Sequence, residues 1–326
     1  MTSCPFVSTG RLPDGDAVRA LIAEAHQLFR AETGGEVSDV YPALSRVPPD
    51  LFGICLTSSE GELYEAGDVR HEFTIMSVAK PFVFALICEA IGPDEAWRRI
   101  GANATGRPFN SLEAIERGVD GRTNPMVNAG AIVTTSLAPG GSPEARWEFV
   151  REGLSRFCGR TLHLHEEVFA SASATNHRNR GIARLLTSLG ALALDPDEAV
   201  DLYTRQSSLS ITARDLAEMG ATLADGGIHP ITRERVVGAD SARRALAVMA
   251  TAGMYETSGD WLYLVGLPGK SGIGGGIVTV SPGKGGLGTF APRLDAAGNS
   301  VRGQRVAHFL AERLGLDLFL SAPRPL

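Results

Sequence analysis

The sequence predicts a mixed α/β fold of the α+β kind: an antiparallel sheet flanked by N- and C-terminal helices, with a helical lobe inserted between the two halves of the sheet. Two strand patterns come early in the chain, a long run of helical patterns follows, and three strand patterns return before a final helix. The short, hairpin-like links favour antiparallel pairing. The order also lacks the strict strand–helix alternation of a doubly wound parallel sheet.

The first half of the expected sheet follows one helix. Residues 16–32 (DAVRALIAEAHQLFRAE) have helical periodicity that stops at Gly34-Gly35. Residues 51–57 (LFGICLT) and 62–68 (ELYEAGD) are expected strands joined by the turn-like SSEG, and together they predict a β-hairpin.

The middle of the chain, from about Ser77 to Gly253, is expected to be mainly helical. Glycine, proline, asparagine and aspartate separate the helical patterns from one another. These patterns are SVAKPFVFALICEAI, SLEAIERG, the stretch around VNAGAIVTTSL, PEARWEFVREGLSRF, RGIARLLTSLG, PDEAVDLYTRQ, TARDLAEMGATLADGG and DSARRALAVMATAG.

The second half of the sheet is expected to follow this block. The strand patterns are WLYLVGL (261–267), GGIVTVS (275–281) and GGLGTFAP (285–292), and a last helix runs through VRGQRVAHFLAERLG. We therefore expect one domain over residues 1–326, with a sheet lobe of about 1–76 plus 255–326 and a helical lobe of 77–254.

Composition excludes several classes of protein. The chain has 326 residues, 31 of them basic and 37 acidic, for a formal net charge of −6, and it lacks a strongly basic stretch, which argues against nucleic acid as a partner. Its longest apolar run, Phe82–Cys88, is far below the roughly 20 residues of a membrane helix. The first residues, MTSCPFVSTG, show no basic segment followed by an apolar one, so we expect a cytoplasmic protein. The four cysteines form no CxxC pair, which indicates neither a disulfide framework nor a zinc site.

Three patterns that resemble known binding motifs do not meet the requirements of those motifs. Residues 283–288 (GKGGLG) lie between two expected strands, whereas a dinucleotide-binding motif opens a helix. Residues 269–271 (GKS) lack the earlier glycine of a phosphate-binding loop. Residues 163–167 (HLHEE) do not have metal-ligand spacing, and we expect no metal site.

Lysine is scarce in this chain, and its positions are informative. Only Lys80, Lys270 and Lys284 are lysines, against 28 arginines. Lysine can lose its proton and act as a base, whereas arginine stays charged. Ser77 and Lys80 form a Ser-x-x-Lys motif at the head of an apolar helix, and a spacing of three places them on the same face. A partly desolvated lysine can remove the proton of a serine nucleophile.

A second lysine motif supports this interpretation. Lys270-Ser271-Gly272 ends a strand-like segment and precedes a glycine-rich turn, where backbone N–H groups can approach a substrate. The order SxxK then KSG is that of serine β-lactamases and penicillin-binding proteins. The SDN motif expected between the two is absent, which argues against a standard β-lactamase.

Longer strings indicate a narrower family. The chain resembles the serine-dependent glutaminases from about residue 20 to residue 315, and the resemblance implies a β-lactamase-like fold, cofactor-free hydrolysis of L-glutamine to glutamate and ammonia, and a homodimer or homotetramer. The strings that carry it are VYPAL, NPMVNAGAI, RNRGIA, ATLADGG, MATAGMYETSG, VGLPGKSGIGGGI and APRLDAAGNSVRG.

The resemblance also implies roles for individual residues. Ser77 matches the nucleophile of the family, Lys80 its partner, and Tyr255 a tyrosine that helps proton transfer. Ile273 takes the place of a valine whose backbone N–H contributes to the oxyanion hole. Tyrosines and asparagines that contact the substrate are matched by Tyr41, Asn128, Asn179 and Tyr203, and Lys270 and Ser271 are supporting residues.

Two positions depart from the family pattern. Ala172 stands where the family has a glutamate that pairs with the α-ammonium of the substrate, and Met76 stands where it has glutamine. Removing one side of a buried charge pair costs about 3–5 kcal/mol. Three hypotheses therefore remain: a glutaminase that holds the ammonium with another carboxylate, a hydrolase of a glutamine analogue without a free α-ammonium, or a non-catalytic small-molecule-binding homologue.

Overall fold

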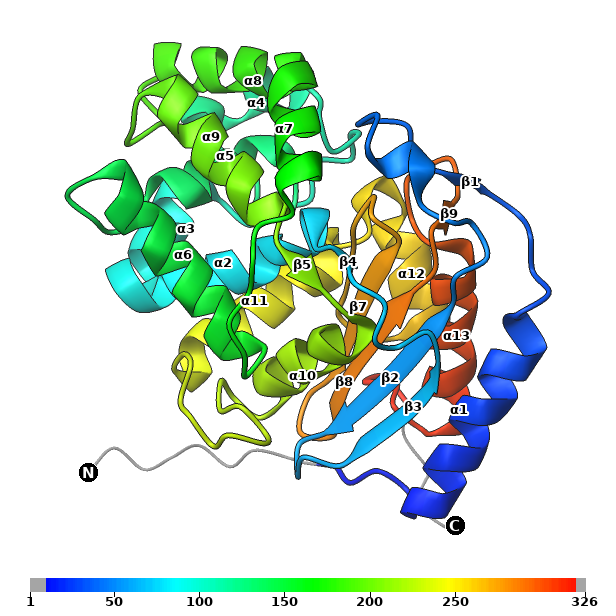
Figure 1. Cartoon of the computed structure of the whole chain (residues 1–326). Helices are drawn as coiled ribbons and strands as arrows, with labels where there is room; N and C mark the ends of the chain where they lie inside the picture. Colours follow the sequence, from blue (N-terminus) through cyan, green and yellow to red (C-terminus); the bar gives the residue numbers. More distant parts are fainter. Residues whose placement is uncertain (1–9, 321–326) are drawn as a thin grey trace, which may run out of the picture.

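The computed structural model describes residues 10–320 and contains one five-stranded antiparallel sheet (Figure 1). Its strand order is β3-β2-β8-β7-β6, so the early hairpin lies beside strands from the end of the chain. The bounds are β2 Gly53–Ser58, β3 Leu63–Gly67, β6 Gly269–Ser271, β7 Gly276–Ser281 and β8 Gly285–Phe290. Two further pairs of short strands are β1 (Glu36–Val37) with β9 (Arg293–Leu294), and β4 (Phe73–Thr74) with β5 (Ser210–Ile211).

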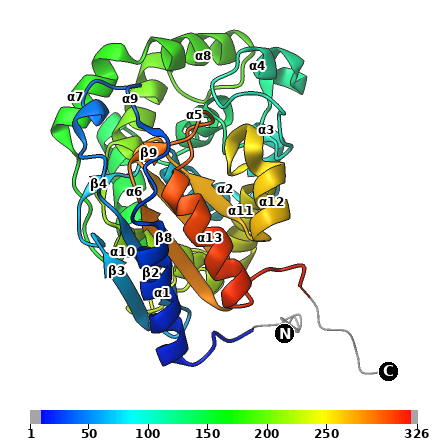
Figure 2. The same cartoon turned by 90° about the vertical axis from the view of Figure 1, so that its right-hand side faces the viewer.

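Helices cover both faces of this sheet. Helices α1 (Gly15–Phe29) and α13 (Val301–Arg313) lie side by side on one face (Figure 2), and α10 (Ala213–Ala224) packs on the other. Successive side chains of β7 point to opposite faces of the sheet. Ile277 packs in the core under α1 and α13, whereas Val278 packs in the core shared with the helical part.

Two glycines of β8 allow α10 to approach the sheet closely. A Cβ atom at Gly286 would lie 2.3 Å from the backbone nitrogen of Ala221, and one at Gly288 would lie 2.3 Å from the carbonyl oxygen of Ala213. The glycine-rich run 283–288 therefore belongs to the β7–β8 hairpin and its contact with a helix.

The helical part surrounds α2 (Ala79–Ile91), whose first ten residues are all buried. This helix is apolar on every side, as expected for a helix at the centre of a core. The helices of this part are α3 Pro93–Ile100, α4 Glu113–Arg117, α5 Asn128–Ser136, α6 Pro143–Phe157, α7 Glu166–Thr175, α8 His177–Ser188, α9 Pro196–Ser207 and α11 Ala239–Ala252.

The antiparallel sheet with terminal helices and an intervening helical block confirms the predicted fold class. The strand expected at 261–267 is wrong, because helix α12 (Ser258–Val265) occupies most of it. Trp261 and Val265, four residues apart, are buried on one side of that helix, while Tyr263 is 89% exposed. Helices α3 and α7 and the short strands were not expected from the sequence, and the lobe boundaries stay a prediction.

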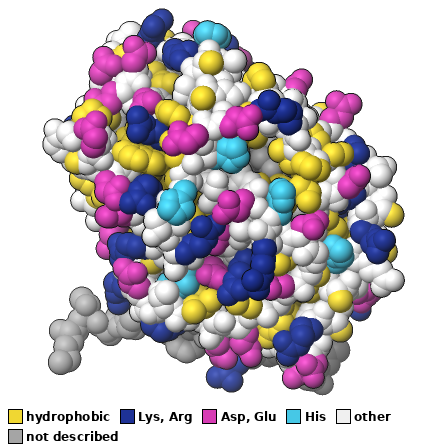
Figure 3. Space-filling view, viewed as in Figure 1, with side chains coloured by type: hydrophobic (Ala, Val, Ile, Leu, Met, Phe, Trp, Pro, Cys, Tyr) yellow, Lys and Arg dark blue, Asp and Glu magenta, His cyan; other side chains and the backbone are white. Residues whose placement is uncertain are grey.

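The surface charge and the lengths of the helices test whether nucleic acid or a membrane is a partner. In the view of Figure 3 basic and acidic side chains are interspersed, so this face has no continuous basic surface of the kind that binds nucleic acid. Among residues 10–320, no helix has both the length and the apolar character needed to cross a membrane. No cluster of three or more potential metal ligands occurs in that same range.

Candidate active site

Ser77 lies at the junction between the short strand β4 and the buried helix α2. It occupies the 3₁₀ turn η2 (Met76–Val78), and Lys80 follows in the first turn of α2. The Lys80 Nζ atom donates a hydrogen bond to the Ser77 Oγ atom at 3.0 Å. This is within the distance at which a base takes a proton from a nucleophile.

The environment of Lys80 favours the uncharged amine. The side chain is 2% exposed, and burial lowers the pKa of Lys80 from 10.5 to about 7. Its Nζ atom also donates to Asn128 Oδ1 at 2.8 Å, and Tyr203 donates to the same oxygen at 3.2 Å. Lys80 can therefore exist partly as a free base near neutral pH.

The asparagines extend this contact into a chain of side-chain amides. Asn128 begins α5, and its Nδ2 atom donates to Asn179 Oδ1 on α8 at 2.9 Å. Asn179 in turn donates to Asn176 Oδ1 at 2.6 Å, and Asn176 donates to Thr204 on α9 at 2.9 Å. Because each of these buried side chains has a hydrogen-bond partner, the network holds Lys80 and the amides in one arrangement.

Tyr255 and the KSG motif contact each other, and strand β6, which carries Lys270 and Ser271, packs against the turn that contains Ser77. The Tyr255 hydroxyl donates to the Ser271 carbonyl oxygen at 3.1 Å, and the Lys270 Nζ atom donates to the same oxygen at 2.6 Å. Lys270 also lies over the Tyr255 ring, 4.1 Å from its centroid. Burial raises the pKa of Tyr255, and burial together with the charge of Lys80 lowers the pKa of Lys270.

Two of the four non-glycine residues with positive φ among residues 10–320 belong to this group. Met76, immediately before Ser77, has φ 46°, and Tyr255 has φ 58°. Left-handed backbone at a non-glycine residue is uncommon and is often found where a catalytic side chain must be held in a set position.

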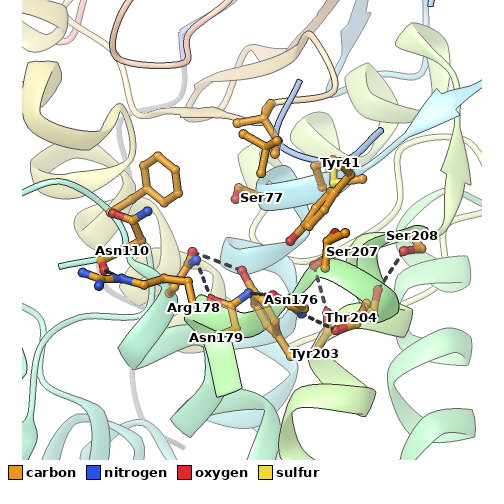
Figure 4. A pocket seen from close by; sticks show the side chains of 17 residues that line it. Tyr41, Ser77, Asn110, Asn176, Arg178, Asn179, Tyr203, Thr204, Ser207 and Ser208 are labelled. Atoms are coloured by element: carbon orange, nitrogen blue, oxygen red, sulfur yellow. Dashed lines mark hydrogen bonds between the residues drawn. The ribbon is translucent and has the colours of Figure 1, made fainter. Parts of the chain in front are cut away.

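Ser77 opens into a cavity of about 270 Å³ (Figure 4). The size suits a small metabolite at the low end of ligand pockets. Of the residues predicted from the sequence, those that line it are Tyr41, Met76, Ser77, Asn128, Ala172, Asn179, Tyr203 and Ile273. Lys80, Tyr255, Lys270 and Ser271 are not among its lining residues; of these, Lys80 contacts Ser77 directly.

Several residues that line the cavity were not predicted. Phe109 and Asn110 come from a loop without a recognisable pattern, and Arg178 is the neighbour of Asn179. The remaining lining residues are Val40, Thr175, Asn176, Thr204, Ser207 and Ser208. The hydroxyl-bearing residues Thr204 and Ser207 are three apart in α9 and Ser208 directly follows that helix, and this spacing was a signal that their side chains lie together.

A Ser–Lys pair at the start of a buried helix, beside a KSG strand of an antiparallel sheet, defines a serine hydrolase of the β-lactamase-like fold. Comparison with known proteins narrows this class. The family model described as Glutaminase matches residues 35–319, so the chain belongs to the glutaminase family.

Individual relatives agree with this assignment. The chain is 64% identical over 318 residues to Glutaminase 2 of Yersinia pestis, with 98% of this chain and 94% of that protein covered. It is 46% identical over 306 residues to a glutaminase of Brucella canis, covering 94% and 96% of the two chains.

Solved structures agree with it as well. A probable glutaminase, ybaS, superposes with a TM-score of 0.93 at 42% identity, covering 94% of this chain and all of the other. Mglu in its glutamate form superposes with a TM-score of 0.89 at 37% identity, covering 94% and 71% of the two chains.

Proposed function

We propose that this protein hydrolyses the side-chain amide of L-glutamine to L-glutamate and ammonia through an acyl-enzyme on Ser77. The observation that carries the proposal is the 3.0 Å contact between Lys80 Nζ and Ser77 Oγ beside the cavity. Family membership and a relative solved in its glutamate form support the choice of substrate.

In the first half of the reaction the neutral amine of Lys80 takes the Ser77 proton while Oγ bonds to the amide carbon. The negative charge that develops on the carbonyl oxygen is stabilised by backbone N–H groups at the cavity wall, of which the family resemblance assigns that of Ile273. The carbon–nitrogen bond then breaks, and the departing nitrogen receives the proton and leaves as ammonia. Tyr255, kept protonated by its raised pKa, assists this proton transfer.

In the second half a water molecule attacks the ester carbon of the acyl-enzyme. Lys80, again neutral, takes the proton of the water, and the same N–H groups hold the oxyanion. The bond to Ser77 Oγ breaks, Oγ regains a proton, and the carboxylic acid leaves. Lys270 and Ser271 keep Tyr255 in position through the contacts at the Ser271 carbonyl.

The test is ammonia release from L-glutamine by the native protein and by Ser77→Ala. We expect turnover by the native protein, none above background by the variant, and an acylated Ser77 by mass spectrometry after rapid quenching. Absence of both ammonia and acyl-enzyme in the native protein would support the third hypothesis, a non-catalytic binding homologue.

We also propose, on the family resemblance, that the working form is a homodimer or homotetramer and that it is cytoplasmic. Light scattering behind size exclusion measures the first, and cell fractionation the second. A monomer at micromolar concentration would contradict the assembly.

A further inference from the structure

The charges around the cavity suit an anion better than a zwitterion. Among residues 10–320, no carboxylate lines the cavity, and Arg178 is the one charged side chain that does. Arg178 lies at one side of the cavity, where its Nε atom donates to the Asn110 carbonyl oxygen at 2.9 Å (Figure 4). Lys80, which contacts Ser77, adds positive charge whenever it is protonated.

The amide network presents donors to a bound molecule. Because both Lys80 and Tyr203 donate to Asn128 Oδ1, the orientation of that amide is fixed. Asn128 uses one N–H for Asn179, and Asn179 uses one for Asn176, so each amide keeps a second N–H. Two N–H donors suit a carboxylate and offer nothing to an ammonium group.

Three hydroxyl groups that line the cavity, those of Thr175, Ser207 and Ser208, are neutral acceptors. Thr175, Ser207 and Ser208 donate to the backbone carbonyls of residues 171, 203 and 204, at 2.9 Å in each case. Their lone pairs can accept one N–H of a neutral group, but they carry no negative charge to balance an ammonium ion.

The acidic side chains around the site have other partners or face solvent. Beside Tyr255, Glu256 is exposed and Asp295 accepts a hydrogen bond from Gln304 Nε2 at 2.8 Å. Glu167 pairs with Arg46, and Glu166 is exposed. Asp201, which lines a neighbouring cavity, pairs with Arg205 at 2.7 Å. Ala172, at the position where the family has a glutamate, contributes only a methyl group to the cavity wall.

We propose that this cavity hydrolyses γ-carboxamides that have a carboxylate and no free α-ammonium, such as deaminated or N-acylated glutamine, in preference to glutamine itself, which remains a slower substrate. The proposal rests on the proposed amide hydrolysis at Ser77 and specifies its substrate class. Glutamine loses the hydration of its ammonium on binding without gaining an ion pair, whereas a monoanionic γ-amide has no such group to desolvate.

The experiment compares three probes with the native protein: L-glutamine, N-acetyl-L-glutamine and glutaramate, the γ-amide without an α-amine. We expect kcat/KM for at least one of the two monoanionic amides to exceed that for glutamine by about tenfold or more. Ammonia release is measured for every probe, and Ser77→Ala is the blank for each.

A matched pair of variants isolates the effect of a negative charge at position 172. Ala172→Glu adds a carboxylate to the wall, and Ala172→Gln adds nearly the same volume without charge. We expect Ala172→Glu to shift the ratio of kcat/KM towards glutamine by about tenfold to a hundredfold relative to Ala172→Gln, because an ammonium would gain a charge-assisted hydrogen bond.

The outcomes separate the two proposals. No activity on any probe would mean that the proposed hydrolysis fails. Activity in which glutamine exceeds both monoanionic amides by more than tenfold would leave the hydrolysis standing and overturn the substrate class. The kcat/KM values of the native protein for the three probes decide between these outcomes even if the variants do not fold.

Discussion

The strongest prediction concerns Lys80, because its burial determines both the pH dependence of activity and a part of the stability. Only the neutral amine can accept the Ser77 proton. Since the pKa of Lys80 is lowered to about 7, kcat/KM should rise with pH through about 7 and level off above it. Lys80→Arg, which cannot lose its proton, should lower kcat by about a hundredfold or more.

The same burial predicts a gain in stability when the charge is removed. The difference between 10.5 and about 7 corresponds, at 1.36 kcal/mol per pH unit, to a cost of about 5 kcal/mol for the charged form. Loss of the hydrogen bonds to Ser77 and Asn128 offsets about 1 kcal/mol each. Lys80→Met should therefore be more stable than the native protein by about 3 kcal/mol at pH 6.

The sign of the pH dependence follows from the lowered pKa. Between about pH 7 and pH 10.5 the unfolded chain keeps the lysine proton and the folded chain has released it, so native stability rises with pH. The advantage of Lys80→Met should accordingly shrink as the pH approaches 10.5. Urea denaturation at pH 6 and pH 9.5 measures both differences. A Lys80→Met protein less stable than the native one at pH 6, or a kcat/KM that falls between pH 6 and pH 8, would refute the reasoning.

Three further predictions concern other parts of the structure. Asn128→Asp places a carboxylate 2.8 Å from Lys80, which should raise the lysine pKa and move the midpoint of the pH–rate profile upward by about 1 unit or more. Tyr255→Phe should lower kcat by about tenfold or more with little change in KM, measured by initial rates, because only proton transfer is impaired. Gly286→Ala should destabilise the protein by about 3 kcal/mol or more through its clash with α10, whereas Gly181→Ala, in open space on α8, should stabilise it by about 0.5–1 kcal/mol.

Each of these has a clear contrary result. An unchanged or lower pH midpoint for Asn128→Asp would show that the two groups are not coupled. A Tyr255→Phe protein with native kcat would remove the tyrosine from the proton path. Equal urea midpoints for the two glycine variants would mean that the approach of β8 to α10 has room for a methyl group.

Local patterns were sufficient for most of the secondary structure and for the Ser77–Lys80 pair. Ser77 lies in the 3₁₀ turn η2 and Lys80 in the first turn of α2, which follows without a break, so a spacing of three residues is enough to bring the two side chains together. The apolar run 261–267 was mistaken for a strand because a short run does not distinguish the two structures. Its helical form depends on the burial of Trp261, whose Nε1 atom donates to the Leu267 carbonyl oxygen at 2.8 Å.

By itself, the sequence determined the fold class, the proximity of Ser77 and Lys80, and the resemblance to the glutaminase family, which the comparisons confirmed. Only the tertiary structure decided the amide network and the charge of the cavity wall. Asn128 and Asn179 are 51 residues apart, and their contact depends on how α5 and α8 pack. Whether Ala172 leaves the wall without a carboxylate likewise depends on every element that surrounds it, because any of them could have supplied one.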